Sequence, residues 1–242
     1  MHQARHRWES GFFLAEGPRA VSWVVQHHPD KIDEILLSNE GNAPRWNHGN
    51  VRVISPKQLQ EISTLVTPQE PIAVCRIPEG FLTNTLPPDV GQHILLLEHI
   101  QDPGNVGTLI RSAAAFGFSG IICSDQTADP FSPKVVHAVM GAVYGVWIRR
   151  TAEYLELVQQ LQQTGYQLIA TTLDGAGDLS LDRDQAVILA IGNEGNGLTA
   201  ELTTLANQRV RLAFDSTQVE SLNAAIAGSI LMHHCYQARQ QM

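Results

Sequence analysis

The chain has 242 residues, 43% of them hydrophobic and 17% charged, and its formal net charge is −8. This composition excludes an intrinsically disordered chain, and no apolar run approaches the roughly 18 residues that a membrane span needs. The acidic balance also argues against a broad, non-specific nucleic-acid-binding face, so any polyanion site must be a local patch. The best candidate for such a patch is the opening segment, with His2, Arg5, His6, Arg7 and Arg19.

The cysteines indicate the compartment. Cys75, Cys123 and Cys235 lie far apart and are odd in number. This pattern is typical of reduced, buried thiols in a cytoplasmic protein and not of a disulfide framework or a zinc site. The opening residues contain no apolar segment of the kind found in secretory signals. We therefore expect a cytoplasmic protein without a membrane segment and without a bound metal.

The first third of the chain alternates short apolar runs with amphipathic ones. These runs predict strands at residues 11–17, 32–38, 51–55 and 72–77, and helices at 18–28 and 56–66. This order indicates a small α/β domain over residues 1–80. The Pro- and Gly-rich stretch that follows has no sustained apolar period, and we interpret residues 81–92 as a linker.

The remaining residues, 93–242, alternate strands and helices more regularly. The strands are expected at 93–100, 120–125, 147–150, 166–172, 186–192 and 209–214, and the helices at 105–117, from 132, 152–165, 199–206 and from 221. Strands that alternate with helices of ten or more residues predict βαβ units and a mostly parallel sheet. In such sheets ligands bind beyond the carboxyl ends of the strands.

The first polar segment at a strand end carries Asn105 and Arg111. On a helix these positions are separated by about 120°, so they can meet only at the edge of a groove. The alternative is that Asn105 is an ordinary helix cap and Arg111 a solvated side chain.

The second segment follows an apolar strand with Gly192, Gly195 and Gly197. Clustered glycines let a backbone approach a ligand closely, although a glycine-rich turn before a helix capped by Thr199 has the same pattern. The spacing is GxxGxG instead of GxGxxG, which argues against a dinucleotide-binding oxidoreductase.

The third segment leads into the last helix through Ser221 and Asn223. Small residues follow at 224, 225 and 227–229, which permits close helix packing and suggests a subunit interface. The alternative is a half-buried terminal helix capped by Ser221.

Together these segments resemble the SpoU/TrmH family of SPOUT-class RNA methyltransferases. The matching blocks are DPGNVGTLIRSAAAFGF (102–118), IGNEGNGL (191–198) and VESLNAAIAG (219–228), in the order and spacing of that family. DPFSPKVVHAVMGA (129–142) resembles its lysine-containing stretch, and FFLAEGPRAV (12–21) resembles the start of the L30e-like RNA-binding domain of many members.

The resemblance implies methylation of a ribose 2′-hydroxyl in structured RNA, rRNA more than tRNA, with S-adenosylmethionine as cofactor. It implies an α/β fold in which a SPOUT-type, mostly parallel sheet carries a C-terminal trefoil knot over residues 93–242, preceded by a small L30e-like domain over residues 1–80. It also implies a homodimer. The catalytic residues it implies are Asn105, Arg111, Glu194, Ser221 and Asn223. The cofactor-binding residues it implies are Gly192, Asn193, Gly197, Leu198, Leu212 and Leu222.

One departure from the family pattern leaves a second function open. The chain has Leu212-Ala213-Phe214 where the family usually has an Ile-Pro-Met corner. With the acidic charge, this keeps the alternative of a knotted RNA-binding or ribosome-assembly factor with weak or no methyltransferase activity. An N1-guanine methyltransferase of the same superclass is a further alternative, but the NEG and SLN blocks favour ribose.

Overall fold

The computed structural model describes residues 3–39, 46, 49–139, 141–175, 177, 179–215 and 217–240. By backbone packing the chain divides into two compact units. Unit 1 takes the chain up to Glu79 together with Asp129–Tyr144, and unit 2 takes Gly80–Ala128 together with the chain from Gly145 onward.

Unit 1 contains a four-stranded sheet in the order β1-β4-β2-β3. Its elements in chain order are α1 (Ala4–Ser10), β1 (Phe12–Glu16), α2 (Pro18–His27), η1 (Pro29–Lys31), β2 (Ile32–Leu37), β3 (Val51–Val53), α3 (Pro56–Ile62), β4 (Ile72–Arg76), α5 (Pro133–Val139) and η3 (Ala142–Tyr144). The central strand β4 runs antiparallel to β1 and β2, whereas β2 and β3 are parallel. The segment 129–144 belongs here because α5 packs on β1 and the ring of Phe131 lies 5.1 Å from that of Phe13.

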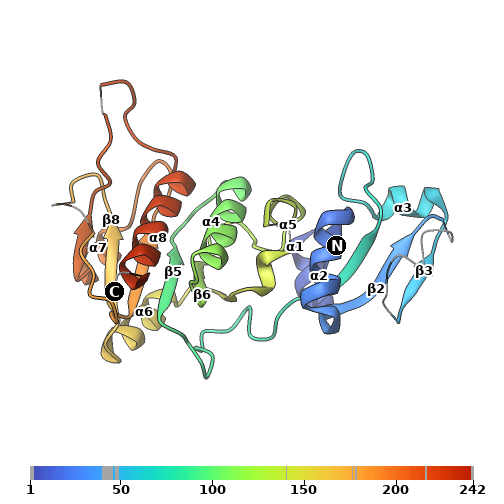
Figure 1. The fold of residues 1–242 in the computed structure, drawn as a ribbon, viewed down its shortest axis with the longest axis horizontal. Coiled ribbons are helices and arrows are strands. Elements are labelled where there is room, and N and C mark those ends of the chain that lie inside the picture. The colour runs from blue at the N-terminus through green and yellow to red at the C-terminus, as the bar shows by residue number, and fades with distance from the viewer. Residues whose placement is uncertain are drawn as a thin grey trace. The chain divides into compact units, whose positions relative to one another are not determined.

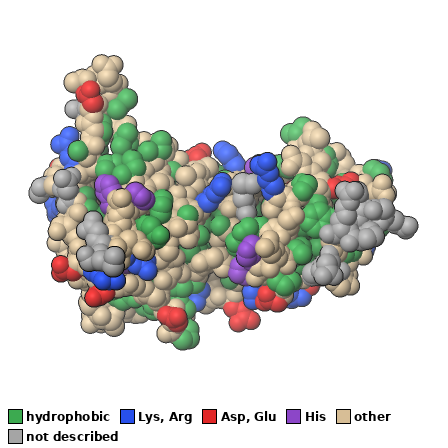
Figure 2. All heavy atoms as spheres, viewed as in Figure 1, with side chains coloured by type: hydrophobic (Ala, Val, Ile, Leu, Met, Phe, Trp, Pro, Cys, Tyr) green, Lys and Arg blue, Asp and Glu red, His purple; other side chains and the backbone are tan. Residues whose placement is uncertain are grey.

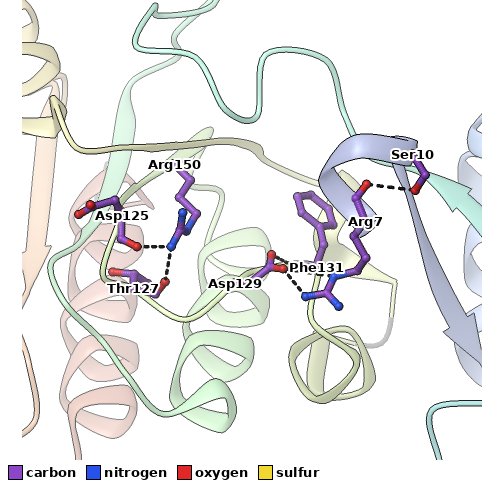
Figure 3. A network of polar contacts seen from close by, with 7 residues as sticks. All are labelled: Arg7, Ser10, Asp125, Thr127, Asp129, Phe131 and Arg150. Carbon is purple, nitrogen blue, oxygen red and sulfur yellow. Dashed lines mark hydrogen bonds and ion pairs between the residues drawn. The ribbon is translucent and has the colours of Figure 1, made fainter. Parts of the chain in front are cut away.

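The helix α1 is not among the expected elements, since its sequence has no apolar period. It is held by Arg7, whose side chain points to Asp129 (Figure 3). Arg7 is only 3% exposed, and its Nη2 lies 2.5 Å from Asp129 Oδ2. Arg7 is therefore a buried structural cation, and the expectation that it belongs to an exposed polyanion patch is wrong.

The other described members of that patch lie at the surface. Arg5 forms an ion pair with Glu9 across one helical turn, at 2.6 Å. Arg19 and His6 are exposed, and His2 lies outside the described residues. On the face drawn in Figure 2, Lys and Arg form small groups separated by other side-chain types instead of one broad basic area.

Unit 2 contains a six-stranded, entirely parallel sheet in the order β10-β8-β9-β5-β6-β7. Its elements in chain order are β5 (His93–Leu97), α4 (Pro103–Ala115), β6 (Gly120–Ser124), β7 (Trp147–Thr151), α6 (Tyr154–Gln163), β8 (Gln167–Thr171), β9 (Val187–Ile191), α7 (Ala200–Leu205), β10 (Gln208–Val210) and α8 (Ala224–Gln240). The expected α/β fold with a mostly parallel sheet is confirmed.

Helices cover both faces of this sheet, which is why its central strands are apolar throughout. Alternate residues of β5 and β9, such as Ile94 and Ile188, form one core with α6 and α7. On the other face α4 and α8 lie side by side (Figure 1). There Gly228 permits close packing, because a Cβ would lie 2.5 Å from Leu109 Cδ2.

Several boundaries differ from the expected ones. The stretch 81–92 packs onto unit 2 instead of linking two domains freely, because Phe81 is buried and Leu86 and Val90 pack against the core. Strand β10 ends at Val210, short of 214, and α8 begins at Ala224 instead of 221. The described residues between these two elements extend beyond the sheet at the end where the strands terminate (Figure 1). Within the described residues, no helix has the length and apolar content of a membrane span.

Candidate active site

A cavity of about 960 Å³ lies at the carboxyl ends of neighbouring strands of unit 2. Its walls are the segments that follow β8, β9 and β10 and the chain entering α8. This is the edge at which open parallel sheets bind ligands, and the volume is within the usual range of about 300–1,000 Å³ for small-molecule sites. The cavity is lined by the predicted site residues Gly192, Asn193, Glu194, Gly197, Leu198, Leu212, Ser221, Leu222 and Asn223.

The wall that follows β9 is a tight loop. Asn193 and Gly197 exchange backbone hydrogen bonds of 3.0 and 2.9 Å, and Gly197 has φ +69°. The backbone of Gly197 and Leu198 passes so close to Gly192 that a Cβ there would lie 2.3 Å from the carbonyl carbon of Gly197. Only glycine fits at position 192, and the loop therefore presents main chain to the cavity.

The side chain of Asn193 shapes this loop. Its Oδ1 accepts hydrogen bonds from the backbone N–H groups of Gly195 and Asn196, both at 3.0 Å, and its Nδ2 donates to the carbonyl oxygen of His99 at 2.8 Å. The side chain of Asn193 thus holds the loop, and all three of these hydrogen bonds are to backbone groups.

The entry to α8 forms the opposite wall. Asn223 caps this helix, because its Oδ1 accepts from the N–H groups of Ala225 and Ile226 at 2.9 and 3.2 Å. The alternative that Ser221 is the cap is wrong. Ser221 is exposed and lies on the cavity wall with Leu222 and Leu212.

A chain of side-chain hydrogen bonds joins three predicted catalytic residues. Asn223 Nδ2 donates to Asn105 Oδ1 at 3.0 Å, and Asn105 Nδ2 donates to Glu194 Oε1 at 2.8 Å. Asn105 does not cap α4, because the cap is Asp102, whose carboxylate accepts from the Asn105 N–H at 2.9 Å. Asn105 is therefore free of a capping role and uses its amide to connect two walls of the cavity.

Arg111 lies elsewhere on α4. It is exposed and is not among the residues that line the cavity of its own chain. This agrees with the angular separation of about 120° from Asn105. The structure thus brings together every predicted site residue except Arg111.

Sequence reasoning did not single out several described polar residues of the cavity wall, and Thr172 is the one among them with an unpaired buried hydroxyl. Thr172 follows β8 and lines the cavity, and its Oγ1 is buried without a hydrogen-bond partner among the described residues. A buried hydroxyl without a partner is unfavourable, which suits a polar ligand in the cavity. A wall formed by the main chain around Gly192 and Gly197, together with the unpaired Thr172 hydroxyl, fits a cofactor that carries both polar and apolar groups. Among the described residues, no group of three or more His, Cys, Asp or Glu could hold a metal ion.

The fold and the cavity define an α/β protein whose unit 2 has a parallel sheet with a cavity of small-molecule size at its strand ends. Residues 92–233 match the model of the SpoU rRNA Methylase family, and the chain belongs to that family.

Relatives match along almost the whole chain. The 23S rRNA (guanosine(2553)-2′-O)-methyltransferase RlmP of Bacillus subtilis is 30% identical over 97% of this chain and 92% of its own. The structure of an AdoMet-bound rRNA methyltransferase from Sinorhizobium meliloti is 30% identical, with a TM-score of 0.81 over 98% of this chain and 91% of its own. The SpoU methyltransferase AviRb from Streptomyces viridochromogenes, in complex with AdoMet, is 26% identical with a TM-score of 0.82, over 99% and 94%.

Proposed function

We propose that this chain is an S-adenosylmethionine-dependent enzyme that methylates a ribose 2′-hydroxyl in ribosomal RNA. The observation that carries the proposal is the cavity, since nine of the residues implied by the family motifs line it. The family match and the rRNA methyltransferases among the relatives support the reaction class and the rRNA substrate. The cytoplasm, where rRNA is modified, is the proposed location.

The cofactor is proposed to lie against main chain. Gly192, Gly197 and Leu198 would form one wall of its site and Leu212 and Leu222 another, with the Asn193 backbone between them. S-adenosylmethionine supplies a methyl group on a positively charged sulfur, already activated for transfer. The chain therefore has to orient this group and the ribose oxygen in line, which in well-oriented reactions lowers the barrier by about 7–11 kcal/mol.

The polar residues are proposed to bind the ribose and its phosphate. Asn105 and Asn223 hold each other in a fixed orientation, with Glu194 accepting from Asn105, so their amides form a rigid surface for sugar hydroxyls. Ser221 lies beside them on the wall. A guanidinium group is a poor proton acceptor, so the role proposed for Arg111 is to bind a phosphate and the negative charge that develops on the 2′-oxygen.

Three architectural features complete the proposal. The first is a C-terminal trefoil knot, supported by the close approach of Gly175 to the end of β10, where a Cβ would lie 2.6 Å from the Val210 carbonyl carbon. The second is a homodimer through α4 and α8, supported by the exposed apolar side chains of Ile226 and Tyr236. In such a dimer Arg111 can serve a cavity other than its own. The third is an L30e-like RNA-binding role for unit 1, supported by its small mixed sheet and helices.

The test is ribose-methylation mapping of total RNA from cells with and without this protein. We expect one rRNA ribose to lose its methyl group, to regain it with the wild-type gene and to remain unmethylated with Arg111→Ala. Calorimetry with S-adenosylmethionine separates this from the assembly-factor alternative. No lost site together with no cofactor binding at millimolar concentration would overturn the proposed function in favour of that alternative.

A further inference from the structure

A buried carboxylate lies directly behind the loop that walls the cavity. Glu98 follows β5 and is 0% exposed. Its Oε1 accepts from the hydroxyls of Tyr154 at 2.6 Å and Thr199 at 2.8 Å, and its Oε2 accepts from the backbone N–H of Thr199 at 2.7 Å. Within the part of the chain that the structure describes, no Lys, Arg or His forms an ion pair with it.

This arrangement is unfavourable for stability alone. A buried carboxylate without a cation has a desolvation cost that hydrogen bonds only partly offset, and apolar side chains of similar volume are usually at least as stabilising. Tyr154 remains a donor, because burial and the neighbouring Glu98 raise the pKa of its hydroxyl above the ordinary value. Two of the three hydrogen bonds go to Thr199, the residue that ends the cavity loop and caps α7.

The next residue holds the other end of the same loop. His99 has φ +58°, a left-handed conformation that is uncommon for a side-chain-bearing residue. Its N–H donates to Ser124 Oγ at 2.9 Å, and its carbonyl oxygen accepts from Asn193 Nδ2 at 2.8 Å. Two consecutive residues after β5 therefore hold Asn193 and Thr199, the first and last residues of the loop.

We propose that Glu98 is a positioning residue that, with His99, holds the loop 193–199 in the conformation that receives the cofactor. The inference rests on the proposed function for the identity of that cofactor, S-adenosylmethionine. A carboxylate suits this position because three donors converge on its two acceptor oxygens. An amide has one acceptor oxygen, so its NH₂ group would either face the Thr199 N–H, donor against donor, or force the Tyr154 and Thr199 hydroxyls to turn and accept from it.

The decisive comparison is Glu98→Gln against Tyr154→Phe. Both variants remove hydrogen bonds from the same buried cluster, but only Glu98→Gln releases the loop. For Glu98→Gln we expect S-adenosylmethionine to bind at least roughly ten-fold more weakly by calorimetry, because a lost hydrogen bond to a charged group corresponds to such a factor. We also expect faster amide exchange at residues 193–199 in the ligand-free chain. Tyr154→Phe lowers the melting temperature but leaves cofactor affinity and loop exchange near wild type.

A second pair covers the case in which Glu98→Gln fails to fold. Thr199→Val removes the hydroxyl bond to Glu98, and Thr199→Ser retains it, so only the valine variant is expected to lose affinity and loop protection. Equal changes in Glu98→Gln and Tyr154→Phe, or in the two Thr199 variants, would overturn the assignment. If the wild-type chain binds no S-adenosylmethionine, the proposed function fails, and amide exchange alone then decides whether Glu98 holds the loop.

Discussion

Replacing Gly192 by alanine is expected to weaken cofactor binding severely without unfolding the protein. The perturbation is one methyl group at the carboxyl end of β9, directed into the turn of the cavity loop. The atoms it meets belong to the main chain of Gly197 and Leu198, which cannot rotate away as a side chain can. The loop as a whole must therefore move.

The size of the movement follows from the contact distances. The added Cβ would lie 2.3 Å from the Gly197 carbonyl carbon and 2.4 Å from the Leu198 nitrogen. Normal contacts between such atoms are about 3.5–4.0 Å, so the loop must shift by more than roughly 1 Å. Overpacking of this kind costs about 1–3 kcal/mol, which corresponds to cofactor binding weakened by roughly five-fold to 150-fold if the strain is relieved by moving the loop.

The assay is calorimetric titration of each variant with S-adenosylmethionine, beside a thermal melt. The matched control is Gly195→Ala in the same loop, where a Cβ would meet only Asn193 Oδ1, at an ordinary 3.6 Å. Gly197→Ala separates strain from steric overlap, since its φ is +69° but its Cβ would meet nothing within 4 Å. Equal cofactor affinity in Gly192→Ala and Gly195→Ala would refute the steric argument.

Three further predictions concern stability. Arg7→Ala leaves the Asp129 carboxylate buried without its ion-pair partner. In urea titrations this is expected to lower the free energy of unfolding of unit 1 by about 3–5 kcal/mol. The double variant Arg7→Met with Asp129→Leu replaces the ion pair by apolar side chains and should largely reverse that loss. Asn223→Ala removes the α8 cap and should cost about 1 kcal/mol in thermal melts, whereas an unchanged melting temperature would contradict the capping role. Burial lowers the pKa of His93 to about 4, from 6.5 in the unfolded chain, so the unfolded state binds the proton first and stability falls as the pH drops from 6.5 towards 4. At pH 5 the loss relative to pH 7.5 should be about 2 kcal/mol, and His93→Gln should remove this part of the pH dependence.

The regular elements of unit 2 were predictable because local pattern and final environment agree there. The run HILLL is apolar throughout, and β5 is buried on both faces by helices. The local hydrophobic pattern of the sequence is uninformative where contacts between distant residues determine whether an element forms and where it ends. The helix α1 depends on an ion pair between residues 122 positions apart. Among the described residues, strand β10 pairs with β8 alone, and it stops at Val210, where the following chain leaves the sheet to form the cavity wall.

The site shows the same division. Local motifs predicted the loop glycines and the polar residues Asn105, Glu194 and Asn223, which the structure brings together, because short sequence blocks carry them. The cap of α4 was assigned wrongly in the alternative that made Asn105 the cap, because the cap is Asp102, which precedes a proline at the first helical position. Glu98 gave no such signal. Its role depends on Thr199, which lies 101 positions away, and a single sequence does not show that pairing.

The discontinuity of unit 1 has a consequence for its biosynthesis. Gly80–Ala128, which belongs to unit 2, is translated before Asp129–Tyr144 completes unit 1. At about 5–20 residues per second, the nascent N-terminal sheet waits roughly 3–12 s until α5 has been translated. Until then the guanidinium of Arg7 lacks its ion-pair partner Asp129, and β1 lacks the packing of α5. Unit 1 therefore cannot complete its fold until part of unit 2 has been translated. An N-terminal fragment that ends at Glu79 lacks residues 129–144, which belong to the fold of unit 1.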